Sequence, residues 1–289
     1  MKLLSYGLDQ RMEPRLAFLL NGYAVDVMRA SLWMKENHKA QDYLSLPSSM
    51  KLALLDWGHS LPLLQNLERA LQGIALAELN IYGRPVALLE TDVVFFAPVP
   101  DPPALRYFAA FEPDAGFSFG NTQTLLGNNQ PLSHAGLTAK GEIACVIAGK
   151  ETALQIAGYC IVNNWFDTQL DPNNGLTQGL ATSLGPYLVT ADELGPHKLG
   201  QGFSLDLQMR INGLLTTEYR LKNMTVSFSE MIKSALKTRA QAGDVFCSGS
   251  PSNLKSNRPT KPGDRVEVEI QVLGTLTTHI KEKDDDTFR

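Results

Sequence analysis

Short runs of alternating apolar and polar residues dominate the second half of the chain. Five such runs cover residues 142–148, 159–165, 186–192, 204–213 and 265–274, and Gly, Asn, Asp or Pro residues bound them. A period of two places alternate side chains on opposite faces of an extended strand. Several short strands separated by turn residues are typical of a sheet that curls into a roll or barrel. The pattern predicts a sheet-rich α+β fold.

Two stretches carry helical periodicity instead. Residues 61–76 and residues 227–239 place apolar side chains three or four positions apart, as on one face of a helix. In the second stretch we take Ser229 as the helix start, because the apolar positions follow it directly. The proline-rich residues 98–103 predict a break between a first and a main part of the chain.

The composition limits the class of protein. The 289 residues are 44% hydrophobic, enough for a sizeable core, and their formal net charge is −4. An acidic chain is not expected to bind nucleic acid, and no apolar run approaches the roughly 20 residues that span a membrane. Cys145, Cys160 and Cys247 lack the spacing of a metal site, and residues 1–15 lack the long apolar stretch expected of a signal peptide. We expect a cytoplasmic protein whose cysteines are small, reduced core residues.

The most informative motif lies at residues 158–194. It contains Gly158, Tyr159, Asn163, Trp165 and the run TSLGPYLVT at residues 182–190. These residues resemble the core signature of the fumarylacetoacetate hydrolase family. Five further fragments match the family in the same order, at residues 1–7, 22–27, 46–50, 97–108 and 261–276.

The resemblance covers nearly the whole chain and implies its architecture. We expect a fumarylacetoacetate-hydrolase-like mixed β roll over residues 101–289, a small N-terminal α+β domain over residues 1–75, and a linker over residues 76–100. Members of the family pair through the main domain, so the resemblance also implies a homodimer.

The resemblance further implies a metal site, most of which this chain has lost. Members of the family hold a divalent cation, usually magnesium or calcium, with four carboxylates. The matching positions here are Tyr107, Lys140, Glu142 and Asn164. Their formal charges sum to zero, so three carboxylate attractions of roughly 4 kcal/mol each are missing. We therefore expect no metal and no other cofactor.

Four more positions match catalytic or substrate-contacting residues of the family. Asp114 replaces its general-base His, and Gln178 replaces a Lys. Asp167 lies in the segment that has lost a substrate-contacting Arg, whereas Ser250 keeps the hydroxyl of the family's Ser-Gly-Thr. The catalytic candidates are thus Lys140, Glu142, Tyr107 and Asp114, and the substrate-binding candidates are Asn164, Asp167, Gln178 and Ser250.

Each candidate has a structural alternative. Lys140 can point to solvent with Glu142 as its exposed partner, Tyr107 can be a core aromatic, and Asn164 can be satisfied by backbone at a strand end. Asp114 and Asp167 can be solvated. Because Lys140 and Glu142 are two positions apart in an extended segment, we expect both to face the pocket and to form an ion pair.

Three functions fit these residues. The first is a metal-independent enzyme acting on a β-diketone, β-keto acid or enol-type carbonyl compound, by C–C hydrolysis, decarboxylation, tautomerisation or cyclisation. The second is a catalytically inactive binding or scaffolding protein, and the third is a hydrolase with a shifted metal site. We favour the first, because the replacements at the lost ligand positions are functional side chains. The expected partner is a small carbonyl or carboxylate ligand.

Overall fold

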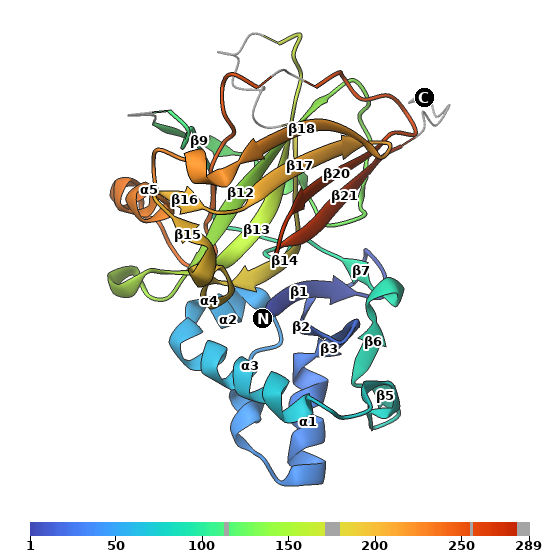
Figure 1. The fold of residues 1–289 in the computed structure, drawn as a ribbon. Helices are drawn as coiled ribbons and strands as arrows, with labels where there is room; N and C mark the ends of the chain where they lie inside the picture. The colour runs from blue at the N-terminus through green and yellow to red at the C-terminus, as the bar shows by residue number, and fades with distance from the viewer. Residues whose placement is uncertain (113–115, 171–179, 255–256, 282–289) are drawn as a thin grey trace.

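The structure is a computed structural model that describes residues 1–112, 116–170, 180–254 and 257–281. Its main feature is a sheet of 12 strands, counted over these residues (Figure 1). In spatial order the main path is β6 (Ala87–Leu89), β3 (Tyr23–Asp26), β2 (Arg15–Leu20), β1 (Lys2–Gly7), β14 (Ala181–Thr190), β13 (Gln155–Phe166), β12 (Thr138–Ala148), β19 (Val245–Cys247), β8 (Leu105–Phe108) and β9 (Phe117–Gly120). Off this path, β10 (Leu125–Leu126) pairs with β14 and β7 (Val94–Phe95) pairs with β1.

A second sheet lies across the centre of the first. Its five strands are β11 (Pro131–Leu132), β21 (Gly274–Ile280), β20 (Arg265–Ile270), β17 (Asp206–Ile211) and β18 (Leu214–Arg220). Two short hairpins, β4 (Asn80–Ile81) with β5 (Arg84–Pro85) and β15 (Lys198–Leu199) with β16 (Gly202–Phe203), complete the strands of the described residues. The predicted sheet-rich α+β fold is confirmed.

Three helices cover the other face of the large sheet. They are α1 (Val27–His38), α2 (Met50–Leu55) and α3 (Trp57–Leu71), drawn in blue below the strands in Figure 1. Alternation along β12 separates two cores: Ile143 and Cys145 pack toward the five-stranded sheet, whereas Ala144 and Val146 belong to the core on the helical side. The face that a β12 residue occupies therefore decides which core it joins.

The N-terminal strands are part of the large sheet. Strand β1 pairs antiparallel with β14, with Lys2 opposite Val189. Between residues 76 and 100, β6 pairs with β3 and β7 pairs with β1. The domain limits at residues 75 and 100 stay a prediction.

The helix expected over residues 227–239 begins earlier than Ser229. Helix α5 (Phe228–Ala235) has Ser227 as its N-cap, whose hydroxyl accepts the N–H of Glu230 while the Glu230 carboxylate accepts the N–H of Ser227. This capping box satisfies two free N–H groups of the first turn, which Ser229 inside the helix cannot do. A short 3₁₀ turn, Leu236–Thr238, follows the helix.

The cysteines are confirmed as core residues. Cys145, Cys160 and Cys247 are all buried and form no disulfide, and burial raises the pKa of each thiol. Within the described ranges, no helix combines the length and the apolarity needed to cross a membrane.

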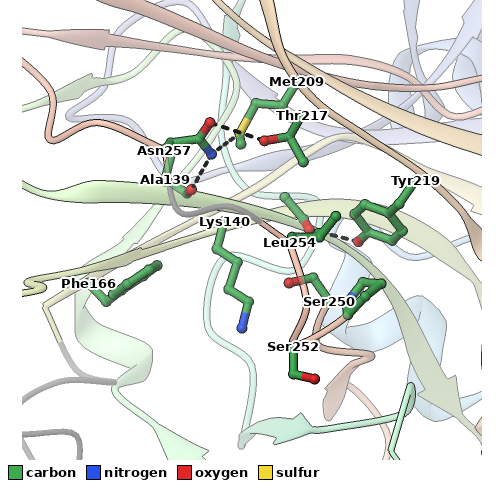
Figure 2. Close-up of a pocket in the computed structure, with 12 residues that line it drawn as sticks. Ala139, Lys140, Phe166, Met209, Thr217, Tyr219, Ser250, Ser252, Leu254 and Asn257 are labelled. Carbon is green, nitrogen blue, oxygen red and sulfur yellow. Dashed lines mark hydrogen bonds between the residues drawn. The ribbon is translucent and has the colours of Figure 1, made fainter.

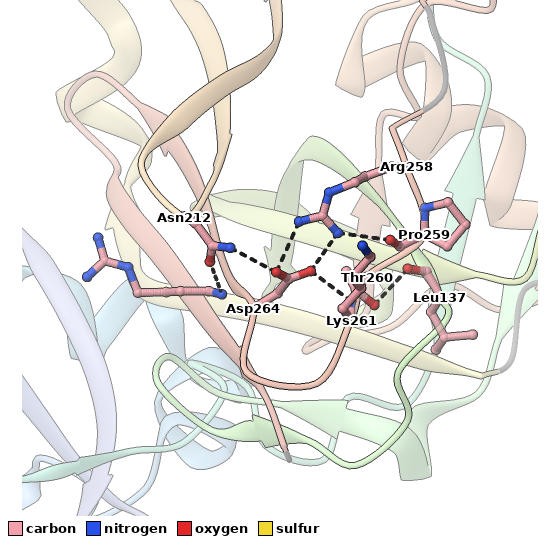
Figure 3. A network of polar contacts seen from close by, with 8 residues as sticks. Leu137, Asn212, Arg258, Pro259, Thr260, Lys261 and Asp264 are labelled. Carbon is pink, nitrogen blue, oxygen red and sulfur yellow. Dashed lines mark hydrogen bonds and ion pairs between the residues drawn. The ribbon is translucent and has the colours of Figure 1, made fainter. Parts of the chain in front are cut away.

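A polar network fixes the turn that enters β20. The Asp264 carboxylate accepts hydrogen bonds from the Arg258 guanidinium at 2.7 and 3.0 Å, from the Asn212 amide at 2.8 Å and from the Lys261 N–H at 2.7 Å (Figure 3). These donors hold the pKa of Asp264 near 2, and the Arg258 bonds have the largest effect. The bonds from Arg258 and Lys261 join segments of the turn to one another, and the bond from Asn212 joins the turn to the end of β17, so the carboxylate has a structural role.

Candidate functional site

The site forms where β12 and β13 run side by side. Lys140 on β12 lies opposite Asn164 on β13, and Glu142 lies opposite Val162. Gly141, between the two charged residues, points toward the five-stranded sheet, where an added Cβ would come within 2.8 Å of Val268. Lys140 and Glu142 therefore share the opposite face, as the two-residue spacing predicts.

A cavity of about 370 Å³ opens on that face, and we call it the Glu142 cavity. Five of the predicted residues line it together with the backbone of the loop after β19. These wall residues are Tyr107, Lys140, Glu142, Asn164, Gly249 and Ser250. The structure thus brings together positions that are up to 143 residues apart in the sequence, from Tyr107 to Ser250.

Glu142 is the most perturbed acid of this cavity. Its side chain is 2% exposed, and its Oε2 accepts the N–H of Gly249 at 3.1 Å. Burial raises the pKa of Glu142 to about 7, against the opposing effects of the Lys140 charge, the Gly249 N–H and a hydrogen bond from Asn164. A buried carboxyl with so few donors resists ionisation, so both protonation states are populated near neutral pH.

The expected ion pair between Lys140 and Glu142 is not formed. Among the ion pairs of the described residues, none includes the Lys140 ammonium. Lys140 is half-buried, and its side chain extends away from its strand (Figure 2). Its charge acts on Glu142 through space, which lowers the pKa of the carboxyl without neutralising it.

The loop after β19 approaches the site closely because Gly249 has no side chain. Gly249 has a φ of +69°, and an added Cβ would lie 2.3 Å from the carbonyl oxygen of Phe108. This conformation directs the Gly249 N–H at Glu142 and places Ser250 on the cavity wall. The Ser250 hydroxyl and the Asn164 side-chain oxygen are both buried without a hydrogen-bond partner. Two buried polar atoms without partners on one wall are a natural place for a polar ligand group.

Tyr107 has both a structural and a cavity-facing part. Its ring packs in the helical-side core, in a space that exists because position 120 is Gly: an added Cβ there would be 2.3 Å from the ring. Its hydroxyl is hydrogen-bonded to the Thr182 hydroxyl. Burial raises the pKa of Tyr107 well above its ordinary value, so the phenol is neutral and can act only as a hydrogen-bonding group.

Of the three remaining predicted residues, Asp167 alone belongs to the described residues, and it does not line this cavity. Asp167 is half-buried just after β13, and its carboxylate accepts the N–H of Gln169 at 2.8 Å, as in a turn. It is absent from the walls of the Glu142 cavity, so a substrate-binding role for it finds no support there. Asp114 and Gln178 lie outside the described residues.

The described residues that line the cavity do not fit a divalent cation. They offer one carboxylate whose pKa is raised, a neutral phenol, an amide oxygen and a built-in ammonium. Hard cations need several oxygen ligands, commonly with two or more carboxylates. Within the described part of the chain, no three His, Cys, Asp or Glu residues are grouped as a metal site would require.

A family profile described as "Fumarylacetoacetate (FAA) hydrolase C-terminal" matches residues 109–281. The match spans more than half of the chain and includes β12, β13 and the loop that carries Ser250. The chain belongs to the fumarylacetoacetate hydrolase family.

Solved structures support the same fold for this family member. The structure is similar to a maleylpyruvate hydrolase from Sphingobium, solved in complex with manganese(II) ion and pyruvate, with a TM-score of 0.72 and 18% identity over 98% of this chain and 100% of the other. It is also similar to a 5-carboxymethyl-2-hydroxymuconate delta-isomerase from Mycobacterium smegmatis, with a TM-score of 0.64 and 17% identity over 98% and 100% of the two chains. These identities show a shared fold, and the predicted fold class is confirmed.

A sequence relative extends the match toward the N-terminus. An uncharacterized protein of Staphylococcus epidermidis is 26% identical over 246 residues, which cover 74% of this chain and 80% of the relative. The chain therefore has the fold of the fumarylacetoacetate hydrolase family, which a solved hydrolase and a solved isomerase share. This fold is enzyme-like.

Sequence reasoning missed two residues that shape the site. Gly249, the donor to Glu142, sits inside the Ser-Gly-Ser run, and a Gly between two polar residues at a strand end is a signal for a left-handed or close-packed position. Thr182, the partner of Tyr107, lies in the matched run at residues 182–190. Nothing in the sequence pattern alone joins Thr182 to Tyr107.

Proposed function

We propose that this protein is a metal-independent enzyme that transfers a proton at the carbon next to a carbonyl group. Its substrate would be a β-diketone, β-keto acid or enol-type oxo acid. One observation supports this most: Glu142, on the wall of a 370 Å³ cavity, has a pKa of about 7. Catalytic acids and bases work best when their pKa is close to the working pH.

The proposed step is a tautomerisation. The ionised Glu142 takes the α-proton of the carbonyl compound, which leaves an enolate, and the protonated Glu142 returns a proton to the other end of the enolate. No net proton is gained or lost, and no co-reactant is needed. Hydrolysis of a C–C bond would also need an activated water, and the described wall offers only one carboxyl for all proton transfers. Proton transfer is therefore the reaction that the described groups support best.

Three neighbours would hold the substrate during this step. The Lys140 ammonium supplies a fixed positive charge where a carboxylate or enolate oxygen would lie. The Ser250 hydroxyl, which has no partner in the protein, can donate to the same oxygen, while the buried Asn164 side chain positions Glu142. Fixed donors aimed at a developing negative charge stabilise an enolate more than the neutral substrate.

Two further expectations belong to this proposal. A homodimer is proposed because the family resemblance implies pairing through the main domain, and a cytoplasmic location because the three thiols are reduced core residues. Neither is needed for the proton-transfer step.

The test measures exchange of α-protons for deuterium by NMR, on a panel of oxo acids and β-diketones, with protein treated with EDTA. Glu142→Gln keeps the shape of the side chain and removes the base, so exchange should slow by about 10²- to 10⁴-fold. Lys140→Met should weaken binding of pyruvate about tenfold or more, since a charged contact is lost. Glu13→Gln, at an exposed position between β1 and β2, is the matched control.

Each alternative function has its own result. Exchange that needs an added divalent cation would refute metal independence and favour a shifted metal site. Binding without exchange of any compound would favour the inactive binding protein. Equal exchange by wild type and Glu142→Gln would remove Glu142 from the mechanism.

A further inference from the structure

A second cavity of about 210 Å³ adjoins the first at the open edge of β12 (Figure 2). Strand β12 is paired with β19 only at residues 144–146, so its edge at residues 139–141 is free of a neighbouring strand on that side. Lys140 and Ser250 line both cavities. The remaining walls come from the end of β13, from β17 and β18, and from the loop after Ser250. The two cavities therefore meet around one strand edge.

Apart from Lys140, Ser250 and Ser252, the polar side chains in this second cavity are paired with one another or with the strand edge. The Tyr219 hydroxyl donates to the Gly141 carbonyl at 2.8 Å, and the Asn257 amide donates to the Ala139 carbonyl at 3.1 Å. The Thr217 hydroxyl in turn donates to the Asn257 oxygen at 3.0 Å (Figure 2). Side chains thus satisfy the two carbonyls at the open strand edge, and little polar capacity is left for a ligand.

The surface left for a ligand is apolar. Phe166, Met209, Pro251 and Leu254 contribute side chains to the walls, and we call this space the apolar cavity. A volume of about 210 Å³ exceeds the roughly 150 Å³ of an apolar cavity known to hold benzene. An apolar cavity of this size accommodates a substituent as large as a phenyl ring.

The Glu142 cavity has the opposite character. The Ser250 hydroxyl and the Asn164 oxygen lack partners there, and Lys140 and Glu142 bring ionisable groups. The ligand that fits both spaces has a polar, anionic head and one apolar substituent. Because Lys140 and Ser250 stand at the junction, they would contact the ligand between these two parts.

We infer that the substrate is an oxo acid with an apolar substituent of up to phenyl size, whose head lies by Glu142 and whose substituent fills the apolar cavity. This inference rests on the proposed function for the identity of the head group. The apolar cavity itself is independent of that function, because its character follows from its own walls.

The test measures binding of an oxo-acid series by calorimetry at pH 7. The series is pyruvate, 2-oxobutanoate, 2-oxopentanoate, 2-oxohexanoate and phenylpyruvate. Burial of each added methylene should lower Kd about fourfold until the cavity is filled. A Kd that changes less than twofold over the whole series would overturn the inference.

Two variants assign the effect to this cavity. Leu254→Trp fills the space and should reduce the preference for phenylpyruvate over pyruvate to about twofold or less. Phe166→Ala removes one wall and should lower the same preference, which gives an answer if the Trp variant does not fold. Leu214→Trp, at a position that is 73% exposed on β18, is the control and should leave the preference intact. An unchanged preference in both cavity variants would contradict the inference.

The result separates this inference from the proposed function. Binding that tightens along the series without α-proton exchange would refute the catalysis and support the apolar cavity. Exchange with no dependence on chain length would support the catalysis and refute the apolar cavity.

Discussion

Two carboxyl groups of this protein are almost equally buried and differ widely in their proton affinity. Asp264 is 5% exposed and has a pKa near 2, whereas Glu142 is 2% exposed and has a pKa of about 7. The guanidinium of Arg258, an amide and a backbone N–H surround Asp264. Glu142 receives one backbone N–H and one bond from Asn164, with Lys140 acting only at a distance. Burial has the largest effect on the pKa of Glu142, whereas the hydrogen bonds from Arg258 have the largest effect on the pKa of Asp264.

Asp244 is a third buried carboxyl group. It is paired with Arg106 at 2.8 Å, both side chains are almost fully buried, and one of its oxygens has no partner. Burial raises the pKa of Asp244 even though Arg106 opposes the shift. The Arg106 cation and the backbone N–H of Gln241 thus do not fully compensate this buried carboxylate.

The largest effect on stability is expected at this buried pair. Arg106→Met leaves Asp244 without its cation and should lower the free energy of unfolding by about 3–5 kcal/mol at pH 7, measured by urea denaturation. Arg210→Met removes a cation from the half-exposed pair with Glu269 and should cost less than about 1 kcal/mol. If the two substitutions cost the same, burial of the pair is not what decides its contribution.

The next largest effect on stability is expected at Glu142, where the substitution should stabilise the protein instead of destabilising it. Its pKa is higher in the folded chain than the ordinary 4.5, so folding is favoured by protonation and wild-type stability should fall as pH rises from about 4.5 to 7. Glu142→Gln imitates the protonated form and lacks this loss. It should therefore be more stable than wild type by about 3 kcal/mol at pH 8 and equal to it at pH 4.5. A variant less stable than wild type at pH 8 would mean that the ionised carboxylate is well satisfied.

The smallest effect is expected at Asp264. Its lowered pKa stabilises the fold above the unfolded value near 4, and this contribution is lost as pH falls toward 2. Asp264→Asn should cost about 1–2 kcal/mol at pH 7, because the half-exposed Arg258 is partly screened by solvent, and the cost should decrease below pH 4. Asp206→Asn, whose partner Arg220 is 4.0 Å away, is the exposed control. A cost at Asp264 that does not change with pH would contradict this view of the network.

The sequence predicted those parts of the site that depend on local spacing and on the family motif. Strand alternation places Lys140 and Glu142 on one face, and the matched motif brings Tyr107, Asn164 and Ser250 to the same cavity. The absence of an ion pair between Lys140 and Glu142 was not predictable. The strand fixes the face from which the two side chains start, whereas the positions of the ammonium and the carboxylate depend on the cavity walls. The capping box at Ser227, in contrast, was available from the Ser-x-x-Glu spacing.

The apolar cavity could not be predicted from the sequence, for a different reason. Phe166 and Met209 come from separate strands and have ordinary places in their runs, whereas Leu254 lies in a polar loop. Only the crossing of the two sheets at the open edge of β12 brings them together. The pairing of β1 with β14 is likewise a long-range contact that no local pattern encodes.

The central claim is that Glu142 exchanges its proton near neutral pH, and carboxyl-carbon NMR measures this directly. Wild-type protein labelled at the Glu side-chain carboxyl carbons would be titrated from pH 4 to pH 9, and the signal absent in Glu142→Gln would identify the residue. The account predicts an apparent pKa of about 7 for this signal. A value at or below the ordinary 4.5 would mean that Glu142 is a constantly ionised carboxylate, and the proposed acid–base role would be wrong.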